Sequence, residues 1–223
     1  MRVASTALLC VFAKPPRPGE VKTRLARSLG AEAAATLSQA FFLDTWRSAA
    51  RCAWAHAILA TTDPAAPQWA GIASVWDQGG GDLGHRLERV LSRALEAAPI
   101  ALAIGADTPG LPPRFLELAR DALTTFDAVL GPCEDGGFYL IGLRCCPAGL
   151  FAGLPWSTER IAEQTMQRLR DFGFTVKTLP SWFDLDRIED LRRIQVLLAR
   201  KEIDAPETER ALRTHSVADG LPR

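Results

Sequence analysis

The sequence predicts an α/β fold in which a mostly parallel central sheet is flanked by helices. Short, fully apolar runs such as residues 7–13 and 99–105 are typical of strands that are buried on both faces. Longer segments with helical periodicity, such as 31–51 and 187–201, lie between and after these runs. Because strands that alternate with helices form parallel sheets, this order indicates one large α/β domain.

The remaining elements follow the same signals in chain order. The expected strands cover residues 7–13, 55–62, 72–76, 99–105, 127–132, 138–143 and 174–179. One expected helix begins near residue 21, one ends near residue 97 and one begins near residue 112. Three others cover residues 31–51, 157–172 and 187–201. The short connection between the strands at 127–132 and 138–143 predicts one antiparallel strand. We expect residues 1–203 to form the domain and the polar residues 204–223 to form a loosely held C-terminal tail.

Composition excludes several classes of protein. The net charge is zero, so general attraction to nucleic acid or to a membrane surface is not indicated. No apolar run reaches the roughly 18 residues of a membrane span. Five cysteines form no C-x-x-C pair, which predicts a reduced, cytoplasmic protein with no disulfide framework and no zinc site. With 48% hydrophobic residues the chain can bury a full core, and exposed apolar surface from its six tryptophans would suit a homodimer.

A basic, proline-rich loop follows the first predicted strand. Its three prolines fix φ and remove backbone donors, and a glycine then allows a sharp turn. A rigid cationic loop that leads from a strand to a helix N-terminus is how α/β proteins hold phosphate. The alternative is a solvated basic loop, which would gain nothing from such rigidity. The candidate phosphate-binding residues are Lys14, Arg17, Gly19, Lys22 and Arg24, and Lys22 is also a candidate catalytic residue.

A glycine-rich segment at residues 79–84 formally matches the dinucleotide fingerprint G-x-G-x-x-G. The strand before it is short, and Asp82 would point its charge at a pyrophosphate. We therefore favour a flexible loop that lets the backbone approach a nucleotide, with Gly81, Asp82 and Arg86 as candidate contacts.

Two acidic segments are candidate metal ligands. Asp107 follows a buried strand at the edge where open sheets bind ligands, and a carboxylate there suits Mg²⁺ or Mn²⁺. A turn or N-cap aspartate is an equally supported alternative. Asp184 and Asp186 form a D-x-D pattern, which many glycosyltransferases use for metal, and Asp184 or both carboxylates are open to that role. Asp186 is the second candidate ligand, although Asp186 with Glu189 also resembles an N-cap with its capping-box acid.

The segment from Glu134 to Gly137 has two interpretations. Asp-Gly is a strong hairpin signal, so the segment is consistent with a simple turn. In the functional interpretation Asp135 is a general base or a polar anchor, and Gly136 and Gly137 allow close approach of the phosphates or acceptor. The sequence contains neither G-x-S-x-G nor a Walker A motif, which disfavours hydrolytic triads and P-loop chemistry.

Taken together, these motifs resemble a bacterial family of small GT-A-like nucleotide-diphospho-sugar transferases, the arsenosugar-biosynthesis-type glycosyltransferases. The matching segments are F-A-K-x-P-x-P-G-x-V-K-T-R-L at 12–25, G-x-D-L-G-x-R at 80–86, G-x-D-x-P-x-L at 105–111, G-P-x-x-D-G-G-x-Y-L-I-G-L at 131–143 and D-x-D-x-x-x-D-L at 184–191. The family is similar in fold to the guanylyltransferases of molybdenum-cofactor and phospholactate metabolism. This resemblance implies a single Rossmann-like domain that binds a nucleotide through Mg²⁺ or Mn²⁺.

Three functions remain open at this point. In a glycosyltransferase the basic loop holds the diphosphate of a nucleotide-sugar, Asp107 and Asp186 hold the metal, and Asp135 engages a small-molecule acceptor. In a nucleotidyltransferase the same loop holds a nucleoside triphosphate, and a phosphorylated acceptor attacks it. The family favours the first, and the density of cations in the loop favours the second. A non-catalytic nucleotide-binding module is the third, and it predicts that Asp107→Ala leaves nucleotide affinity unchanged.

Overall fold

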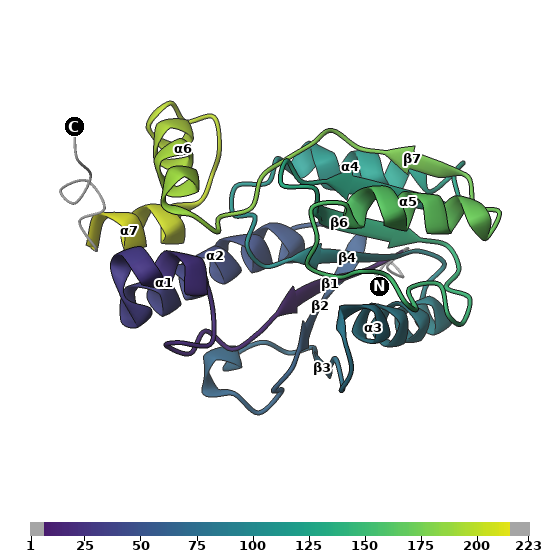
Figure 1. Cartoon of the computed structure of the whole chain (residues 1–223), viewed down its shortest axis with the longest axis horizontal. Coiled ribbons are helices and arrows are strands. Elements are labelled where there is room, and N and C mark those ends of the chain that lie inside the picture. The colour runs from purple at the N-terminus through teal and green to yellow at the C-terminus, as the bar shows by residue number, and fades with distance from the viewer. Residues whose placement is uncertain (1–6, 215–223) are drawn as a thin grey trace.

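A seven-stranded sheet forms the centre of the protein, which the computed structural model describes over residues 7–214 (Figure 1). The strands are β1 (Ala7–Ala13), β2 (Ala55–Thr61), β3 (Val75–Asp77), β4 (Ala101–Gly105), β5 (Ala128–Pro132), β6 (Phe138–Leu143) and β7 (Val176–Thr178). The helices are α1 (Thr23–Leu29), α2 (Ala31–Ala50), α3 (Leu83–Ala97), α4 (Pro113–Ala122), α5 (Ile161–Asp171), α6 (Ile188–Ala199) and α7 (Pro206–Thr214), with a short 3₁₀ helix at Pro67–Trp69. The predicted α/β fold is confirmed.

The sheet has the order β3-β2-β1-β4-β6-β5-β7. Within the described residues every strand runs parallel to the others except β6, which pairs antiparallel with both β4 and β5. This is the antiparallel strand that the short connection after β5 predicts. The carboxyl ends of the parallel strands, including β1, β4 and β5, therefore meet at one edge of the sheet.

Both faces of the sheet are covered, which explains the uninterrupted apolar runs. Side chains of β1 alternate between the faces. Leu9 and Val11 pack in a cluster that includes residues of α2 and α4, whereas Leu8 and Cys10 pack in a cluster that includes residues of α3 and α5. Strand β1 is thus fixed from both sides, and so is the start of the basic loop that follows it.

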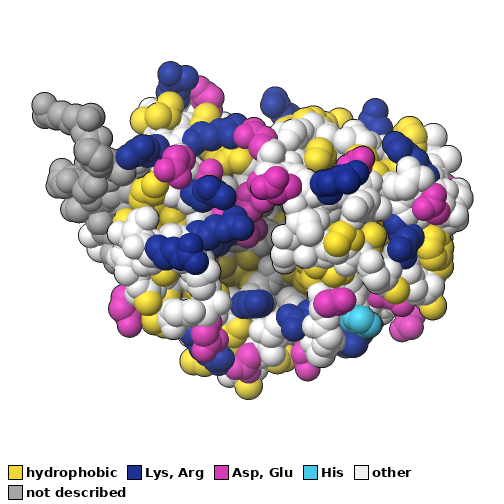
Figure 2. All heavy atoms as spheres, in the orientation of Figure 1, with side chains coloured by type: hydrophobic (Ala, Val, Ile, Leu, Met, Phe, Trp, Pro, Cys, Tyr) yellow, Lys and Arg dark blue, Asp and Glu magenta, His cyan; other side chains and the backbone are white. Residues whose placement is uncertain are grey.

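A third apolar cluster joins α1 and α2 to the C-terminal helices α6 and α7, which gather at one end of the molecule (Figure 1). Leu25, Phe41, Leu191 and Leu212 are buried in it. Figure 2 shows that the visible face is hollowed between this helical end and the rest of the molecule. Acidic and basic side chains gather around the hollow. No helix within residues 7–214 has the length and apolar character that crossing a membrane requires.

The expectation of a loose tail from residue 204 is wrong for residues 206–214, which form α7 and pack against α2. The side chain of Asp44 on α2 is fully buried and accepts hydrogen bonds from the backbone N–H groups of Glu207 (3.1 Å) and Thr208 (2.8 Å). A carboxylate that lies far away in the sequence thus caps the first turn of α7. Residues 215–223 of the expected tail lie outside the described residues.

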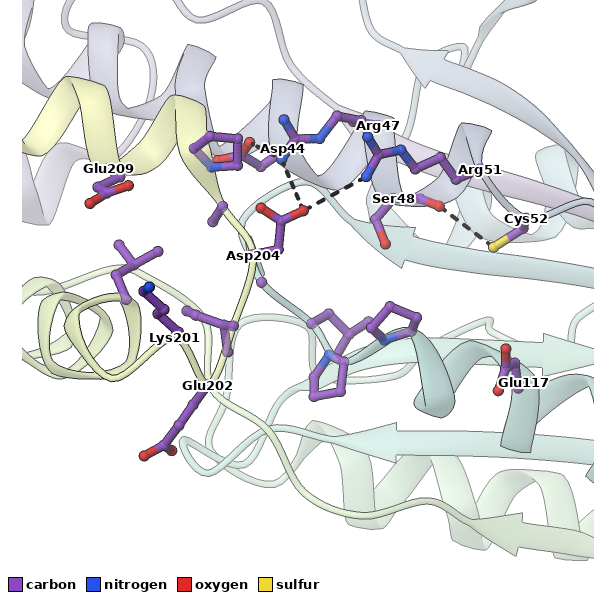
Figure 3. A pocket seen from close by; sticks show the side chains of 18 of the residues that line it. Asp44, Arg47, Ser48, Arg51, Cys52, Glu117, Lys201, Glu202, Asp204 and Glu209 are labelled. Atoms are coloured by element: carbon purple, nitrogen blue, oxygen red, sulfur yellow. Dashed lines mark hydrogen bonds and ion pairs between the residues drawn. The ribbon is translucent and has the colours of Figure 1, made fainter.

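Asp44→Ala is expected to lower the free energy of unfolding by about 2–4 kcal/mol, because two N–H groups of α7 and the guanidinium of Arg47 lose their buried acceptor. Urea unfolding of the purified protein measures this. The control is Asp204→Ala: Asp204 is exposed and contacts Arg47 and Arg51 only at 3.7 Å (Figure 3), so its loss should leave stability close to that of the wild type. Equal effects of the two changes would contradict this assignment.

Candidate active site

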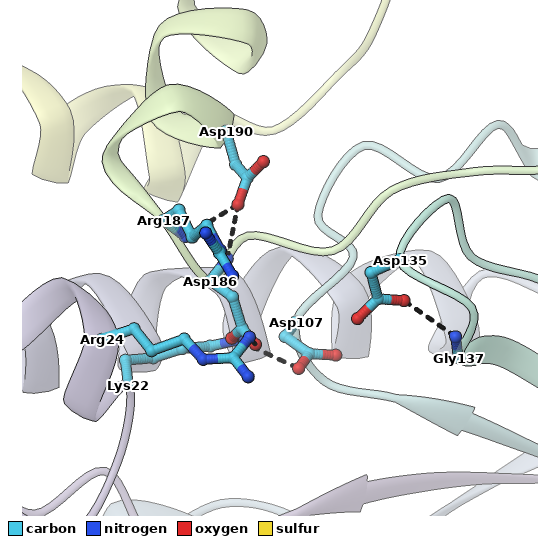
Figure 4. A network of polar contacts seen from close by, with 8 residues as sticks. All are labelled: Lys22, Arg24, Asp107, Asp135, Gly137, Asp186, Arg187 and Asp190. Atoms are coloured by element: carbon cyan, nitrogen blue, oxygen red, sulfur yellow. Dashed lines mark hydrogen bonds and ion pairs between the residues drawn. The ribbon is translucent and has the colours of Figure 1, made fainter. Parts of the chain in front are cut away.

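Lys22 joins two acidic segments at the carboxyl edge of the sheet. Its ammonium donates to Asp107 Oδ2 (3.0 Å), just after β4, and to Asp186 Oδ1 (2.6 Å), just before α6 (Figure 4). The Lys22 side chain is only 8% exposed. Arg24 lies beside it, with a guanidinium nitrogen 3.5 Å from Asp186 Oδ2. Four predicted site residues, from three segments that lie far apart in the sequence, thus meet in one place.

The backbone at Lys22 is unusual. This residue immediately precedes α1 with φ 46° and ψ 46°, in the left-handed region that residues with a side chain rarely adopt. Such a conformation costs about 1–3 kcal/mol and persists only where surrounding contacts enforce it. The two carboxylate contacts of the buried ammonium supply that enforcement. Strain at a polar cluster of this kind is typical of a functional site.

Asp186 is not the N-cap residue that the capping-box interpretation predicts. Asp190 Oδ2 accepts from the backbone N–H groups of Asp186 (3.0 Å) and Arg187 (2.7 Å), so Arg187 is the N-cap of α6. The capping acid is therefore Asp190 rather than Glu189. This shift by one residue leaves the Asp186 carboxylate free for Lys22 and Arg24.

Asp184, which the D-x-D pattern leaves open as a ligand, also belongs to the cluster, and so does Cys133, which the sequence does not predict as a ligand. Asp107, Asp184 and Asp186 each place an oxygen within 4.8 Å of the others, and Cys133, Asp135 and Asp184 form a second group of the same kind. Phe183 and Leu185 are buried in the third apolar cluster. Because side chains alternate along an extended segment, this burial favours the placement of Asp184 and Asp186 on the polar side.

The cluster carries more negative charge than Lys22 neutralises. Burial, together with the neighbouring carboxylates of Asp107, Asp186 and Asp135, raises the pKa of Asp184 to about 7. Burial would also raise the pKa of Asp107, but the charge of Lys22 and its hydrogen bond outweigh that effect and hold the pKa below its usual range. Several half-buried carboxylates that outnumber the counter-charges of Lys22 and Arg24 are the donor set that a hard divalent cation prefers.

A cavity of about 820 Å³ opens next to the cluster. Its lining includes Arg24, Glu134, Asp135, Gly136, Gly137, Ser157, Thr158, Glu159, Asp184, Asp186, Arg187 and Asp190. Asp135 lies across from Lys22 and Arg24 in Figure 4, and its Oδ1 accepts from the backbone N–H of Gly137 (2.9 Å). This is its only hydrogen bond among the described residues, so the carboxylate is available to a ligand.

Gly136 has a packing role in the wall of this cavity. Its φ is 89°, and an added Cβ would lie 1.8 Å from the carbonyl oxygen of Glu159. The backbone N–H of Ala162 donates to the Gly136 carbonyl (3.0 Å). The glycine thus lets the segment before α5 close over the hairpin. That segment is not helical from residue 157 as expected, since Ser157 adopts a left-handed φ of 66° and α5 begins only at Ile161.

The other predicted site residues lie apart from the cluster. Arg17 forms ion pairs with Asp63 and Glu20, Lys14 is exposed, and Gly19 makes the expected turn with a φ of 82°.

In the loop between β3 and α3, Asp82 is the N-cap of the helix and accepts from the backbone N–H of His85 (2.9 Å). Arg86 donates through Nε to the carbonyl of Gly81 (3.0 Å). These three residues therefore have local structural partners, at the same edge of the sheet but not in the acidic cluster.

A second cavity, of about 870 Å³, lies between α2, the start of α4 and the segment that leads into α7 (Figure 3). It contains none of the predicted site residues. Its central charged groups pair with one another, since Asp204 contacts both Arg47 and Arg51. We therefore place the candidate active site at the acidic cluster and not in this cavity.

Solved structures with this fold identify the class of protein. A protein from Desulfovibrio desulfuricans G20 that is assigned as a nucleotide-diphospho-sugar transferase is 28% identical, with a TM-score of 0.84 over 98% of this chain and 100% of that chain. CMP:2-keto-3-deoxy-manno-octonic acid synthetase in complex with CTP is 16% identical (TM-score 0.59, 88% and 100% covered). The 4-diphosphocytidyl-2C-methyl-D-erythritol synthase of Anaerococcus prevotii DSM 20548 is 9% identical (TM-score 0.56, 88% and 98% covered). The latter two share the fold.

The shared fold, together with 28% identity over 98% of the chain to the first of these structures, defines the protein as a transferase with the GT-A-like fold of nucleotide-utilising transferases, as the motifs predict. No curated protein matches the chain. Residues 24–158 match the family described as "Uncharacterized protein conserved in bacteria (DUF2064)", and the chain belongs to this family.

Proposed function

We propose that the protein is a metal-dependent glycosyltransferase that moves a sugar from a nucleotide-sugar donor to a small-molecule hydroxyl. The observation that carries this proposal is the cluster of Asp107, Asp184 and Asp186 around Lys22 at the carboxyl edge of the sheet. The relative that is 28% identical and assigned as a nucleotide-diphospho-sugar transferase supports it.

Asp107, Asp184 and Asp186 would hold Mg²⁺ or Mn²⁺. Their oxygens lie close enough together, all three side chains are half-buried, and their charge exceeds that of Lys22. When bound, the cation would neutralise the diphosphate and stabilise the departing nucleoside diphosphate.

The basic loop would bind the diphosphate itself. Lys22 and Arg24 already lie at the cluster, and Lys14 and Arg17 lie earlier in the same loop. Lys22 also holds Asp107 and Asp186 in position through its two hydrogen bonds. The glycine-rich loop with Gly81, Asp82 and Arg86 follows β3, which lies two strands from β1 in the sheet. There it would contact the nucleoside.

Asp135 would orient and deprotonate the acceptor. Gly137 fixes one of its carboxylate oxygens, which leaves the other oxygen for a hydroxyl in the cavity. In the transfer, the bond between the anomeric carbon and the diphosphate breaks, a bond to the acceptor oxygen forms, and the hydroxyl proton passes to Asp135. We propose that Gly136 and Gly137 keep this wall thin enough for the acceptor to approach.

Nucleotidyl transfer is the second candidate, and it is supported by the fold shared with two cytidylyl-transferring enzymes. The cavity wall argues against it. Six acidic residues line the cavity against two arginines: Glu134, Asp135, Glu159, Asp184, Asp186 and Asp190 against Arg24 and Arg187. Arg193 pairs with Glu134 from outside this lining, and the wall stays acidic. A phosphorylated acceptor would be repelled by this wall, whereas a neutral hydroxyl compound would not. The acceptor we propose is therefore uncharged or cationic.

The released product distinguishes the two reactions. The protein is incubated with Mn²⁺ or Mg²⁺ and either a panel of nucleotide-sugars or the matching nucleoside triphosphates, each with hydroxyl-bearing acceptors. We expect a nucleotide-sugar to yield its nucleoside diphosphate, and chelation of the metal to stop the release. Release of pyrophosphate from a triphosphate, without turnover of any nucleotide-sugar, would show nucleotidyl transfer instead.

A further inference from the structure

Cys133 brings a thiol to the acidic cluster. Its side chain is 8% exposed, and its Sγ lies within 4.8 Å of a carboxylate oxygen of Asp135 and of Asp184, which are equally close to one another. Within residues 7–214 the thiol has no hydrogen-bond partner. The Cys133 side chain belongs to the apolar cluster that includes Tyr139 and Leu179, and its thiol lies where that cluster meets the carboxylates.

The backbone holds this thiol in place from two directions. Cys133 donates its N–H to the Gly137 carbonyl (2.8 Å) within the hairpin. It also forms an isolated parallel bridge with Trp182, in which Glu134 N–H donates to the Trp182 carbonyl (3.0 Å) and Trp182 N–H donates to the Pro132 carbonyl (3.1 Å). The bridge pairs Cys133 with Trp182, two residues before Asp184, and so brings the backbones of the two ligand residues together.

We propose that Cys133, Asp135 and Asp184 form a second cation position, selective for thiophilic divalent metals such as Zn²⁺, Co²⁺ or Cd²⁺. It lies beside the oxygen-only group of Asp107, Asp184 and Asp186 and shares Asp184 with it. Thiolate sulfur favours softer metals, whereas Mg²⁺ and Mn²⁺ favour carboxylate oxygen. Metal–sulfur and metal–oxygen bonds of about 2.3 and 2.0–2.2 Å hold two ligand atoms at most about 4.5 Å apart, close to the 4.8 Å within which these atoms lie. On binding, a sulfur–metal bond forms and the thiol proton passes to solvent.

The two cation positions would have different consequences for the proposed reaction. A metal at the thiol position would engage Asp135, the residue that we propose for the acceptor. Thiophilic metals would then compete with the acceptor, while Mg²⁺ or Mn²⁺ at the oxygen position would not. The existence of the thiol position does not depend on which reaction the protein catalyses.

Cobalt absorption tests this position directly. The reference protein carries Cys145→Ser and Cys146→Ser, because that adjacent pair is at least partly exposed and would bind Co²⁺ itself. Anaerobic titration of this protein with Co²⁺ is expected to produce a near-ultraviolet sulfur-to-cobalt band that saturates at one equivalent and survives excess Mg²⁺. Adding Cys133→Ser should abolish the band, and adding Cys52→Ser should not.

A second variant controls for loss of the folded structure. Asp184→Asn keeps the Cys133 thiol and should weaken the band, with thermal unfolding measured for each variant. Three results would overturn the proposal: visible cobalt absorption without the sulfur band, a sulfur band that persists in Cys133→Ser, or a sulfur band unchanged in Asp184→Asn. Because none of these readouts uses turnover, failure here is distinct from failure of the proposed glycosyl transfer.

Discussion

Asp107→Asn is expected to lower turnover by at least about 10²–10³-fold while the protein remains folded. Asparagine keeps the size of the side chain and one oxygen, but it loses the negative charge that the metal and Lys22 both need. The backbone of residue 107 keeps its role in either case, since its carbonyl accepts from Leu185 N–H (3.0 Å). The initial rate of nucleoside diphosphate release, measured across a series of Mn²⁺ concentrations, provides the test.

The matched control for Asp107→Asn is Asp121→Asn on α4. Asp121 is exposed and pairs only with the neighbouring Arg120 among the described side chains. We expect this variant to turn over at the wild-type rate. If Asp107→Asn also kept the wild-type rate and metal dependence, Asp107 would be a turn residue, and the proposed metal site would be wrong.

Lys22→Met is expected to reduce turnover by at least about 10²-fold and also to destabilise the protein when no divalent cation is present. The methionine fills similar space but leaves Asp107 and Asp186 without their shared counter-charge. We expect a loss of about 1–3 kcal/mol in the free energy of unfolding, below the effect of a fully buried pair because both carboxylates are partly exposed.

A divalent cation should restore part of this stability, because it supplies the missing positive charge to the same carboxylates. Thermal unfolding with and without Mn²⁺ should therefore show a larger metal-induced shift in Lys22→Met than in the wild type. Lys14→Met, in the same loop but exposed, should unfold like the wild type. A variant Lys22→Met that is equally unstable with and without metal would mean that Lys22 serves the fold alone.

The sequence predicts the architecture well because its signals are local. The apolar run of β1 follows from burial on both faces, and the short hairpin after β5 predicts the antiparallel strand β6. The α7 helix is missed for the opposite reason. Its sequence is mostly polar, and it is held by the buried carboxylate of Asp44 on another helix and by a few apolar side chains such as Leu212. A cap that comes from a distant segment leaves no local pattern.

The residues of the candidate site also differ in whether a local pattern in the sequence reveals them. Lys22 and Asp107 stand out because each follows the end of an apolar strand, where ligands of such sheets bind. The assignment of Asp186 to a helix cap is wrong by a single residue, which is the usual uncertainty of a helix start. The approach of Cys133 to Asp184 depends on the bridge at Trp182, an isolated pairing beyond the ends of the strands that no spacing in the sequence encodes.

Thermal unfolding with a panel of nucleotide-sugars, nucleoside diphosphates and nucleoside triphosphates, each with and without Mn²⁺, tests the central claim most directly. We expect one nucleotide-sugar to raise the unfolding temperature more than its matching triphosphate does, only in the presence of Mn²⁺, and not in Asp107→Asn. A larger shift with a triphosphate would contradict the choice of donor. The absence of any shift would contradict the nucleotide site itself.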